Sequence, residues 1–521
     1  MNKNKSNQLR NYKITKIKAK AERNGLGPLK TLSIILLVAC QLSLFILSYL
    51  YIATYIEFYL IFALIATFAA CLHVICSKRN SLSKPVWILF LLTTFAFGYI
   101  FYFISDERIF WHKRKKRYDK ILLKANNYKN ENINLTLTSQ NVLEVKNYLS
   151  SSGFPSYNST NSTYFNDGAP FIDALIKKLK SAQKFIFIEF FIISDGKVFS
   201  RIFDILKEKV KSGVEVRIIY DDLGSHRTLS RKTKKQLKNA GIKLSAFNRI
   251  LPYFSMFINY RDHRKIVVID GKTAFTGGIN LADEYTNEKQ VHGIWKDSGI
   301  MLQGPAVDAM TLAFLSAWEF LNKTDEDYHP YLFHAEKTEN NSIVIPYLDG
   351  LEFETNIGKD VYTNLIASAR EKIYIMSPYL VLDDTIKNLL TLKAQSGVDV
   401  RIIIPEVADK KLVYVQTRNI AEKLMLTGVK LYTLKNSFVH SKLLLTENSA
   451  VVGSINFDLR SFYQQFENAV LLTDTKTLAD INADFENSIE NSTEINTTNM
   501  NRRYLTFRML AGLTSIISPF M

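Results

Sequence analysis

The sequence predicts an α/β protein of two related halves, preceded by membrane-spanning helices. A strand–helix–strand pattern occurs twice, at 181–222 and 368–406, and "SGVEVRIIY" returns 184 residues later as "SGVDVRIII". Each copy leads to a His-x-Lys stretch, and His263 and His440 lie 177 residues apart. Alternating strands and helices are typical of α/β folds with largely parallel strands, buried on both faces. The repeat therefore predicts a duplicated domain with pseudo-twofold symmetry.

Three apolar runs without Asp, Glu, Lys or Arg lie near the N-terminus, at 31–53, 58–77 and 85–105. Each reaches the roughly 20 residues that a transmembrane helix needs, and buried core helices are the alternative. The basic leader 1–30 and the stretch "HKRKKR" at 112–117 both favour the cytoplasm, which three full crossings cannot satisfy. We therefore expect a multi-pass cell-membrane protein with its catalytic domain on the cytoplasmic side. One run would then dip in without crossing, or one basic flank would be overridden.

The charge of the chain predicts an anionic partner. The 521 residues carry a net charge of +17, which suits either nucleic acid or an acidic lipid surface. The apolar runs favour lipid, because much of the excess positive charge flanks them. The only cysteines, Cys40, Cys71 and Cys76, lie inside these runs, which excludes a disulfide framework or a zinc–cysteine site elsewhere.

Shifts in composition divide the chain further. The expected parts are a basic cytoplasmic leader (1–30), a transmembrane region (31–105), a basic juxtamembrane segment and linker (106–168), two repeated domains (169–340 and 341–485), and a linker with a C-terminal amphipathic helix (486–521). The Asn/Ser/Thr-rich stretches at 150–168 and 486–499 are typical of loops. The apolar stretch 251–258 is a candidate lip for acyl chains, or else a buried connector. The C-terminal helix is expected to rest on an anionic membrane or to pack against the core.

The two His-x-Lys stretches carry the chemistry. Residues i and i+2 of a strand point to the same side, so His263 and Lys265 share a face, as do His440 and Lys442. A lysine, an amide and a glycine turn form a good cradle for phosphate oxygens, and a neighbouring histidine can act as nucleophile or proton donor. Displacement at phosphorus needs both roles, and two halves that face one phosphate would supply one histidine each.

The pattern His-x-Lys-(x)4-Asp-(x)6-Gly-Gly/Ser-x-Asn resembles that of the phospholipase D superfamily. The first copy matches at His263, Lys265, Asp270, Gly277, Gly278 and Asn280, and the second at His440, Lys442, Gly453, Ser454 and Asn456, with Glu447 in place of the usual Asp. The stretches "WKDSGIMLQGPAV", "SPYLVLDD" and "GSINFDLRSF", together with the tail "TFRMLAGLTSIISPFM", look like bacterial cardiolipin synthases. This likeness covers roughly residues 80 to 521, and it implies two phospholipase D-like domains.

The resemblance implies a phosphatidyltransferase that needs no metal and no other cofactor. His263 would attack one phosphatidylglycerol, and His440 would protonate the departing glycerol and then activate the hydroxyl of a second phosphatidylglycerol. The resemblance also assigns phosphate-binding roles to Lys265, Lys442, Asn280, Asn456, Gly278 and Ser454. The motif carboxylates Asp270 and Glu447 complete the catalytic motifs, which we expect them to brace.

Each histidine needs a carboxylate to fix its tautomer. By resemblance, Glu467 would orient His440 and Asp297 would orient His263. Glu189 is a charge inside the apolar strand "FIFIEFFI", so it should be paired, and we expect an active-site contact.

The expected partners are phosphatidylglycerol and anionic membrane lipids, and no nucleic acid. The sequence leaves open the acyl-chain preference and the oligomeric state. The same residues would also serve a phospholipase D-type hydrolase, or a transphosphatidylase that uses another acceptor alcohol. A nuclease of the superfamily and a non-catalytic membrane scaffold are the remaining alternatives.

Overall fold

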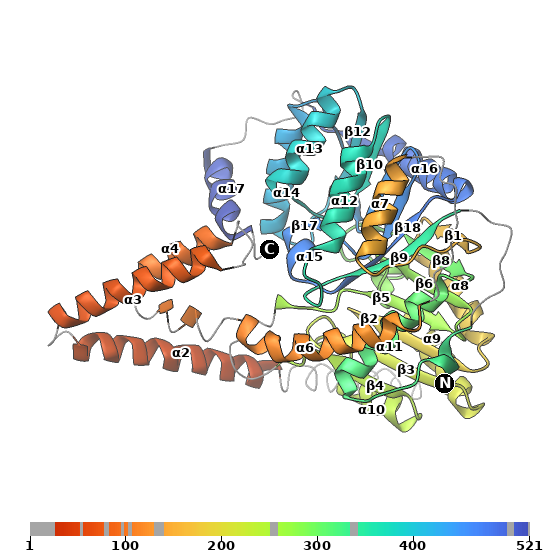
Figure 1. The fold of residues 1–521 in the computed structure, drawn as a ribbon, viewed down its shortest axis with the longest axis horizontal. Helices are drawn as coiled ribbons and strands as arrows, with labels where there is room; N and C mark the ends of the chain where they lie inside the picture. The colour runs from red at the N-terminus through yellow and green to blue at the C-terminus, as the bar shows by residue number, and fades with distance from the viewer. Residues whose placement is uncertain are drawn as a thin grey trace, which may run out of the picture. The chain divides into compact units, whose positions relative to one another are not determined.

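The computed structural model describes residues 27–52, 56–77, 83–94, 98–99, 101–102, 107–129, 140–250, 259–333, 342–496 and 505–518 (Figure 1). The chain forms two compact units, one of residues 1–110 with 249–258 and the other of 111–248 with 259–521. The predicted apolar lip at 251–258 and most of the basic leader lie outside the described residues.

The first unit is helical. Its helices are α2 (Gly27–Ile52), α3 (Ile56–Cys76) and α4 (Lys84–Thr94). α3 packs against α4, and the Tyr102 ring lies between Trp87 of α4 (5.1 Å between centroids) and His73 of α3 (5.8 Å).

Among the described residues, no helix combines the length and the hydropathy that crossing a bilayer requires. The crossings predicted for 31–53, 58–77 and 85–105 are therefore not confirmed.

The first half of the larger unit is a seven-stranded sheet in the order β1-β8-β6-β5-β2-β3-β4. Its strands are β1 (Asn161–Phe165), β2 (Phe185–Phe190), β3 (Glu215–Asp221), β4 (Lys243–Phe247), β5 (Lys265–Ile269), β6 (Thr273–Gly277) and β8 (Gly299–Gln303). Helices α8 (Gly168–Lys180), α9 (Lys197–Lys211) and α10 (Arg231–Asn239) pack on it, and α11 (Val307–Asn322) covers the other face. Because side chains alternate along a strand, Ile186 and Ile188 of β2 join the core beneath α8 and α9, whereas the Phe187 ring stacks on Phe314 of α11, 4.6 Å away.

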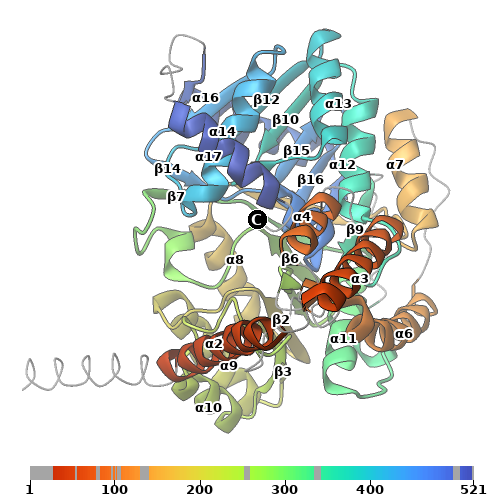
Figure 2. The ribbon, with the colours of Figure 1, turned by 90° about the vertical axis from the view of Figure 1, so that its left-hand side faces the viewer.

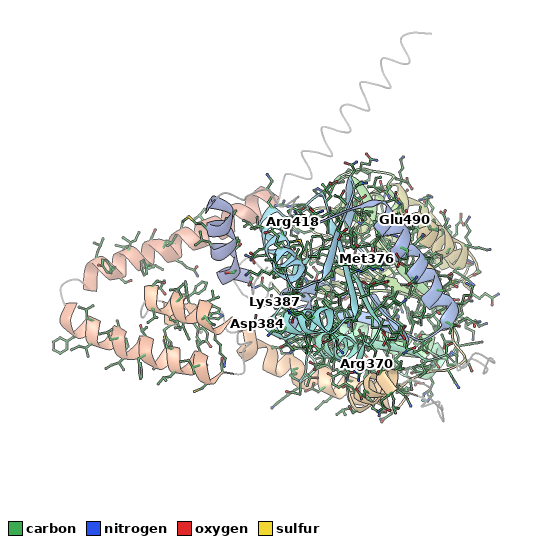
Figure 3. The ribbon with its side chains drawn as sticks, turned by 90° about the horizontal axis from the view of Figure 1, so that it is seen from above. Arg370, Met376, Asp384, Lys387, Arg418 and Glu490 are labelled. Atoms are coloured by element: carbon green, nitrogen blue, oxygen red, sulfur yellow. The ribbon has the colours of Figure 1, made fainter. Side chains whose placement is uncertain are left out.

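The second half repeats this order in an eight-stranded sheet, β19-β13-β12-β10-β15-β16-β18-β9. Its strands are β9 (Val344–Asp349), β10 (Lys372–Met376), β12 (Asp399–Pro405), β13 (Lys430–Leu434), β15 (Leu443–Thr446), β16 (Ala450–Gly453), β18 (Glu467–Leu472) and β19 (Ser492–Glu494). The helices are α12 (Ile357–Ser368), α13 (Asp384–Gln395), α14 (Lys411–Met425) and α16 (Thr475–Glu490). Figure 3 shows Lys387 of α13 and Arg418 of α14 on one side of Met376 in β10, and Glu490 of α16 on the other.

The predicted duplication is present, but the prediction of largely parallel strands is wrong. Among the described strands of the two large sheets, only β2-β3-β4 and β10-β12-β13 run parallel, while the strands that carry the lysines, β5 and β15, run antiparallel to β2 and β10. In addition, β5–β6 and β15–β16 are hairpins, and two strands joined by a tight turn must be antiparallel, which adds a further antiparallel pair to each sheet.

Two stretches predicted as loops contain regular structure. β1 lies within 150–168 and pairs with β8, and β19 lies within 486–499 and pairs with β13. Partners from distant parts of the chain supply the hydrogen bonds of these polar strands, which local composition does not reveal.

The basic helix α6 (Glu107–Asn126) joins the two halves of the larger unit. Its Trp111 indole donates to the carbonyl of Leu351 (3.1 Å), and Arg117 donates to that of Glu319 at the end of α11 (3.0 Å). The Trp111 ring also packs on Phe466, 5.7 Å between centroids. Part of the positive charge of the "HKRKKR" stretch therefore makes contacts within the protein.

The C-terminal helix α17 (Leu505–Ile517) packs on α14 (Figure 2). The Gln416 amide of α14 donates to the carbonyl of Ala511 and to the hydroxyl of Thr514, both at 2.5 Å. Met509 and Leu513 point away from this contact and are 60% and 63% exposed. One face of the predicted amphipathic helix thus packs against the core, and the other carries exposed apolar side chains.

Candidate active site

The first histidine is held by the backbone of the opposite half. His263 lies two residues before Lys265, the first residue of β5, and its N–H donates to the carbonyl of Phe466 (2.8 Å). The N–H of Phe466 in turn donates to the carbonyl of Arg261 (2.9 Å), which forms a parallel bridge between Asp262 and Phe466. The stretch 261–263 therefore runs alongside the start of β18.

The second histidine has the equivalent arrangement, with the two halves exchanged. The short strands β7 (Ile294–Lys296) and β14 (Ser437–Val439) pair in parallel, and His440 follows β14 directly. The N–H of His440 donates to the carbonyl of Lys296 at 2.6 Å. Each histidine is thus fixed by the strand of the other half that carries a buried carboxylate.

The two carboxylates bind the histidines in a crossed arrangement. Nδ1 of His263 lies 2.9 and 3.0 Å from the carboxylate oxygens of Glu467, and Nδ1 of His440 lies 2.7 Å from Oδ2 of Asp297. The predicted pairing, Asp297 with His263 and Glu467 with His440, is therefore wrong. The exchange follows from the inter-half strand pairing, which brings each histidine beside the carboxylate of the opposite half.

The small residues of the two motifs touch these carboxylates. A Cβ on Gly278 would lie 2.1 Å from Oδ1 of Asp297, so only glycine leaves room for the aspartate. The equivalent position in the second half is Ser454, whose hydroxyl donates to Oε2 of Glu467. Gly278 and Ser454, predicted as phosphate-binding residues, therefore contact the orienting carboxylates.

Both motif lysines are buried beside their histidines. Nζ of Lys265 donates to the carbonyl of His263 (2.5 Å), and Nζ of Lys442 donates to the carbonyl of His440. Lys442 Nζ also lies 2.8 Å from Nδ1 of His440. If Nδ1 of His440 donates its proton to Asp297, it has no lone pair that could accept a hydrogen bond from the Lys442 ammonium. We therefore take the carbonyl of His440 as the acceptor for Lys442.

Burial and repulsion between neighbouring cations lower the pKa values of the motif histidines and lysines. Burial, followed by the charges of Lys265 and Lys442, lowers the pKa of both His263 and His440 well below its usual value. Burial also lowers the pKa of Lys265 to about 7 and that of Lys442 to about 8. Each lysine affects the histidines of both halves, so the two motifs share one electrostatic environment.

The pKa values of the two orienting carboxylates shift in the opposite direction. Burial raises the pKa of Asp297 to about 7 and that of Glu467 to about 8, while the neighbouring lysines oppose the shift. We assign the proton of each neutral imidazole to Nδ1, where it is donated to the carboxylate, so that Nε2 keeps its lone pair. Among the residues that the structure describes, neither Nε2 has a hydrogen-bond partner, and His263 and His440 are only 6% and 8% exposed. Two neutral, pre-oriented imidazoles suit nucleophilic attack and proton transfer.

Comparisons with known proteins identify the family of this chain. Residues 175–303 and 362–489 match the family described as "Cardiolipin synthase, PLD-like domain". A cardiolipin synthase of Halalkalibacterium halodurans is 31% identical over 85% of this chain and 90% of its own length, and cardiolipin synthase 2 of Bacillus cereus is 35% identical over 67% and 68%. An uncharacterized protein of Streptococcus mutans is 37% identical over 86% of this chain and 99% of its own.

The chain belongs to the cardiolipin synthase family. It is accordingly an enzyme, of the phosphatidyltransferase class. The crystal structure of a phosphatidylserine synthase from Haemophilus influenzae superposes with a TM-score of 0.57 at 14% identity, over 73% of this chain and 100% of that one, which supports the shared fold.

In this cardiolipin synthase family member the motif carboxylates Asp270 and Glu447 lie at the far ends of β5 and β15 from the histidines. Asp270 accepts backbone N–H bonds from Gln183 (2.8 Å), Lys184 (2.7 Å) and Phe185 (2.9 Å), where β2 begins. Glu447 accepts the N–H of Arg370, just before β10, at 2.9 Å. Their contacts are those of braces between neighbouring strands.

The two motif asparagines differ in their surroundings. Oδ1 of Asn280 accepts the N–H of Ile192 (3.1 Å), and its amide donates to the Tyr285 hydroxyl (2.6 Å). Oδ1 of Asn456 is buried and has no hydrogen-bond partner among the described residues. An unsatisfied buried acceptor is costly, so Asn456 has more freedom than Asn280 to bind a ligand.

Glu189 pairs with a residue that lies between the first histidine and its lysine. Oε1 of Glu189 lies 2.9 Å from Nη2 of Arg264, and Arg264 also binds Oδ1 of Asp262 at 2.9 Å. All three side chains are fully buried. The expectation that Glu189 is paired is confirmed. Among the described residues no contact joins Glu189 to either histidine, so it is linked to the first motif only through Arg264.

Sequence reasoning missed the aromatic residues that surround the imidazoles. Phe191 packs on His263 (5.1 Å), and Tyr285 (5.3 Å), Trp295 (5.4 Å) and Phe438 (5.8 Å) surround His440. A signal was present for two of them, because Phe438 precedes His440 by two residues and Trp295 precedes Asp297 by two. Strand spacing places such pairs on one face.

Proposed function

We propose that this protein synthesises cardiolipin by transferring the phosphatidyl group of one phosphatidylglycerol to another, through a phosphohistidine on His263. The observation that carries the proposal is the crossed pairing, in which each histidine is oriented by a buried carboxylate of the other half. It supports the proposal because it orients both imidazoles in the same way and leaves Nε2 of each available to a substrate.

In the first step, Nε2 of His263 attacks the phosphorus of the donor lipid, and the bond from phosphorus to the headgroup glycerol breaks. His440 donates the Nε2 proton to the departing glycerol oxygen. The substrate phosphodiester brings a negative charge that offsets the lysines, so its arrival raises the pKa of His440 and favours the protonated acid. Lys265, Lys442 and Asn456 stabilise the charge that develops on the phosphate oxygens.

In the second step, the primary hydroxyl of a second phosphatidylglycerol attacks the phosphohistidine. His440 takes the hydroxyl proton on Nε2, the phosphorus–nitrogen bond breaks, and His263 returns to its neutral state. The sum is two phosphatidylglycerol molecules converted to one cardiolipin and one glycerol. Glu467 holds Nδ1–H of His263 throughout, which keeps the reactive nitrogen aimed at phosphorus.

We also propose that the protein works at a membrane surface. Many large apolar side chains of the first unit are exposed; on α2 and α3 they include Leu36, Leu44, Leu47, Leu50, Phe58, Phe62, Ile65 and Phe68. Exposed apolar surface of this extent favours contact with lipid. In a flotation assay the full-length protein should rise with phosphatidylglycerol vesicles at high salt, and protein that stays at the bottom would refute the membrane contact.

The function is tested by incubating the purified full-length protein with phosphatidylglycerol vesicles and analysing the products by mass spectrometry. Cardiolipin and glycerol in equal amounts would support the proposal. Phosphatidic acid alone would identify a hydrolase, and products formed only with an added alcohol would identify a transphosphatidylase of another acceptor. His263→Ala and His440→Ala should each abolish cardiolipin formation, and near-normal turnover in either variant would reject the two-histidine mechanism.

A further inference from the structure

In the part of the chain that the structure describes, two cations near the second motif form no ion pair with a carboxylate. Among the residues that the structure describes, most of the buried or half-buried arginine and lysine side chains near the site are engaged. Arg261 lies near Asp221 (3.5 Å), Arg264 binds Asp262 and Glu189, and Lys265 and Lys442 bind the histidine carbonyls. No carboxylate of the described residues lies within ion-pair distance of Arg460 or Lys410.

Arg460 lies on the turn between the second motif and Glu467. It belongs to the short helix α15 (Leu459–Tyr463), and its carbonyl accepts the N–H groups of Gln464 (2.9 Å) and Gln465 (3.1 Å). This turn leads directly to Phe466, which binds the backbone of His263. Arg460 is half-buried, and its Nε is removed from water without a hydrogen-bond acceptor. A guanidinium nitrogen left in this state is costly until a ligand supplies an acceptor.

The nearest carboxylate in sequence forms no ion pair with Arg460. Asp458 is 5% exposed and caps α15 by accepting the N–H of Ser461 at 2.7 Å. Burial raises the pKa of Asp458, and the charges of Lys410 and Arg460 oppose this rise, so both cations lie in the electrostatic neighbourhood of one buried carboxylate.

Lys410 approaches the same region from the N-terminal end of α14. The loop before it is tied to β14, since the N–H of Val407 donates to the carbonyl of Ser437 (3.2 Å), and β14 leads into His440. Lys410 is exposed, and its Nζ lies 4.8 Å from the ring centroid of Tyr379. The preceding Asp409 accepts the hydroxyl of Tyr379 at 2.5 Å.

Electrostatics supports this placement. After burial and the two motif lysines, the charge of Lys410 lowers the pKa of His263 and contributes to lowering that of His440. The charge of Arg460 also lowers the pKa of His263. Both cations are thus within electrostatic reach of the reacting groups.

We propose that Arg460 and Lys410 form a second anion site, which binds the phosphodiester of the acceptor lipid while its hydroxyl attacks the phosphohistidine. This inference rests on the proposed function. The acceptor carries its own negative phosphate one glycerol away from the attacking oxygen, and Lys265 and Lys442 are occupied by the donor phosphate. Without further positive charge, two phosphates held so close together would repel each other.

The second anion site should affect the reaction of a charged acceptor with the phosphohistidine but not the reaction of a neutral one. Free glycerol can also attack the phosphohistidine: its hydroxyl loses a proton to His440, the phosphorus–nitrogen bond breaks, and phosphatidylglycerol is re-formed. This headgroup exchange uses the same histidines and lysines but an acceptor that has no phosphate. The second anion site is therefore needed for cardiolipin formation and not for exchange.

The test compares the two reactions in one preparation of full-length protein with phosphatidylglycerol vesicles and radiolabelled glycerol. In Arg460→Gln and Lys410→Gln, the ratio of cardiolipin formation to glycerol exchange should fall about tenfold, the value of one charge-assisted hydrogen bond. Arg460→Lys, which keeps the charge, should retain more of the ratio than Arg460→Gln. The matched controls are Lys411→Gln, the next residue along, and Arg418→Gln, on α14 (Figure 3). Arg418 lines a different pocket with Glu406 and Thr433, and both controls should keep the wild-type ratio.

The outcomes separate this inference from the proposed function. If the wild type forms cardiolipin and exchanges glycerol but Arg460→Gln and Lys410→Gln reduce both reactions equally or neither, the second anion site is wrong. If the wild type performs neither reaction, the proposed function itself fails before any variant is compared. A circular-dichroism melting curve identifies a variant that is unfolded, and Arg460→Lys then decides the question.

Discussion

The carboxylate of Glu467 lies 2.9 Å from Nδ1 of His263, although the two residues belong to different halves of the chain. Asp297 and His440 repeat the relationship in reverse at 2.7 Å. The two halves therefore cannot be oriented for catalysis independently of each other. Strand-like pairing of β7 with β14, and of Asp262 with Phe466, fixes both contacts.

The crossed arrangement predicts which histidine responds to which carboxylate. Glu467→Gln should change the nitrogen NMR shifts and tautomer of His263 and leave those of His440 nearly unaltered, while Asp297→Asn should do the opposite. Each variant should lose about tenfold to hundredfold in kcat, because the hydrogen bond that fixes the imidazole tautomer is altered. If Glu467→Gln altered the nitrogen NMR shifts of His440 alone, which lies in the same half, the crossed pairing would be contradicted.

The sequence allowed much of this site to be predicted, and the rest depended on contacts between distant segments. The placement of His263 beside Lys265 follows from strand periodicity, and Asp297 and Glu467 were recognised as the orienting carboxylates. The histidine predicted for each carboxylate was the wrong one, because strand pairing between the halves has no local signal in the sequence. The antiparallel direction of β5 was missed for a similar reason: the repeated strand–helix–strand units reveal the parallel strands, whereas β5 pairs with β2 across a long connection that has no local signal.

Asp270 should contribute to stability and little to turnover. Asp270→Ala removes the acceptor of three backbone N–H groups, which should lower the free energy of unfolding by about 1–3 kcal/mol. Asp270 also has a positive φ of 54°, so Asp270→Asn, which tolerates this conformation and keeps one acceptor oxygen, should lose less. Thermal unfolding measures the effect, with the exposed Asp173→Ala as the control. A large loss of kcat at a temperature where Asp270→Ala is folded would show that the residue acts in catalysis.

The buried group around Arg264 should be sensitive to the loss of its only cation. Arg264→Met leaves the carboxylates of Glu189 and Asp262 buried without their partner, which should cost about 3–5 kcal/mol of stability. Adding Glu189→Gln to Arg264→Met should recover part of the loss, because one unpaired carboxylate is removed. Melting temperatures of the single and double variants test this, and equal stability of Arg264→Met and wild type would argue against the buried ion pair.

The lowered lysine pKa values predict the alkaline limb of the activity profile. Lys265 and Lys442 are charged below their pKa values of about 7 and about 8, and they lose this charge as the pH rises through them. Phosphate binding should therefore weaken above this range, so kcat/KM, which reports the free enzyme, should fall between about pH 7 and pH 9. Lys442→Arg keeps its charge and should flatten part of the fall. A wild-type profile that stays level up to about pH 9.5 would mean that these ammonium groups do not hold the phosphate.

The covalent step can be observed directly by trapping it. His440→Ala should still let His263 attack, at a reduced rate, while removing the base that activates the acceptor, so the phosphatidyl-enzyme should accumulate with phosphatidylglycerol. Peptide mass spectrometry at alkaline pH, where phosphohistidine survives, should then find the added phosphatidyl mass on His263, and His263→Ala/His440→Ala should show none. A phosphatidyl group on another residue, or none on His263 in a preparation whose wild type makes cardiolipin, would contradict the two-histidine account.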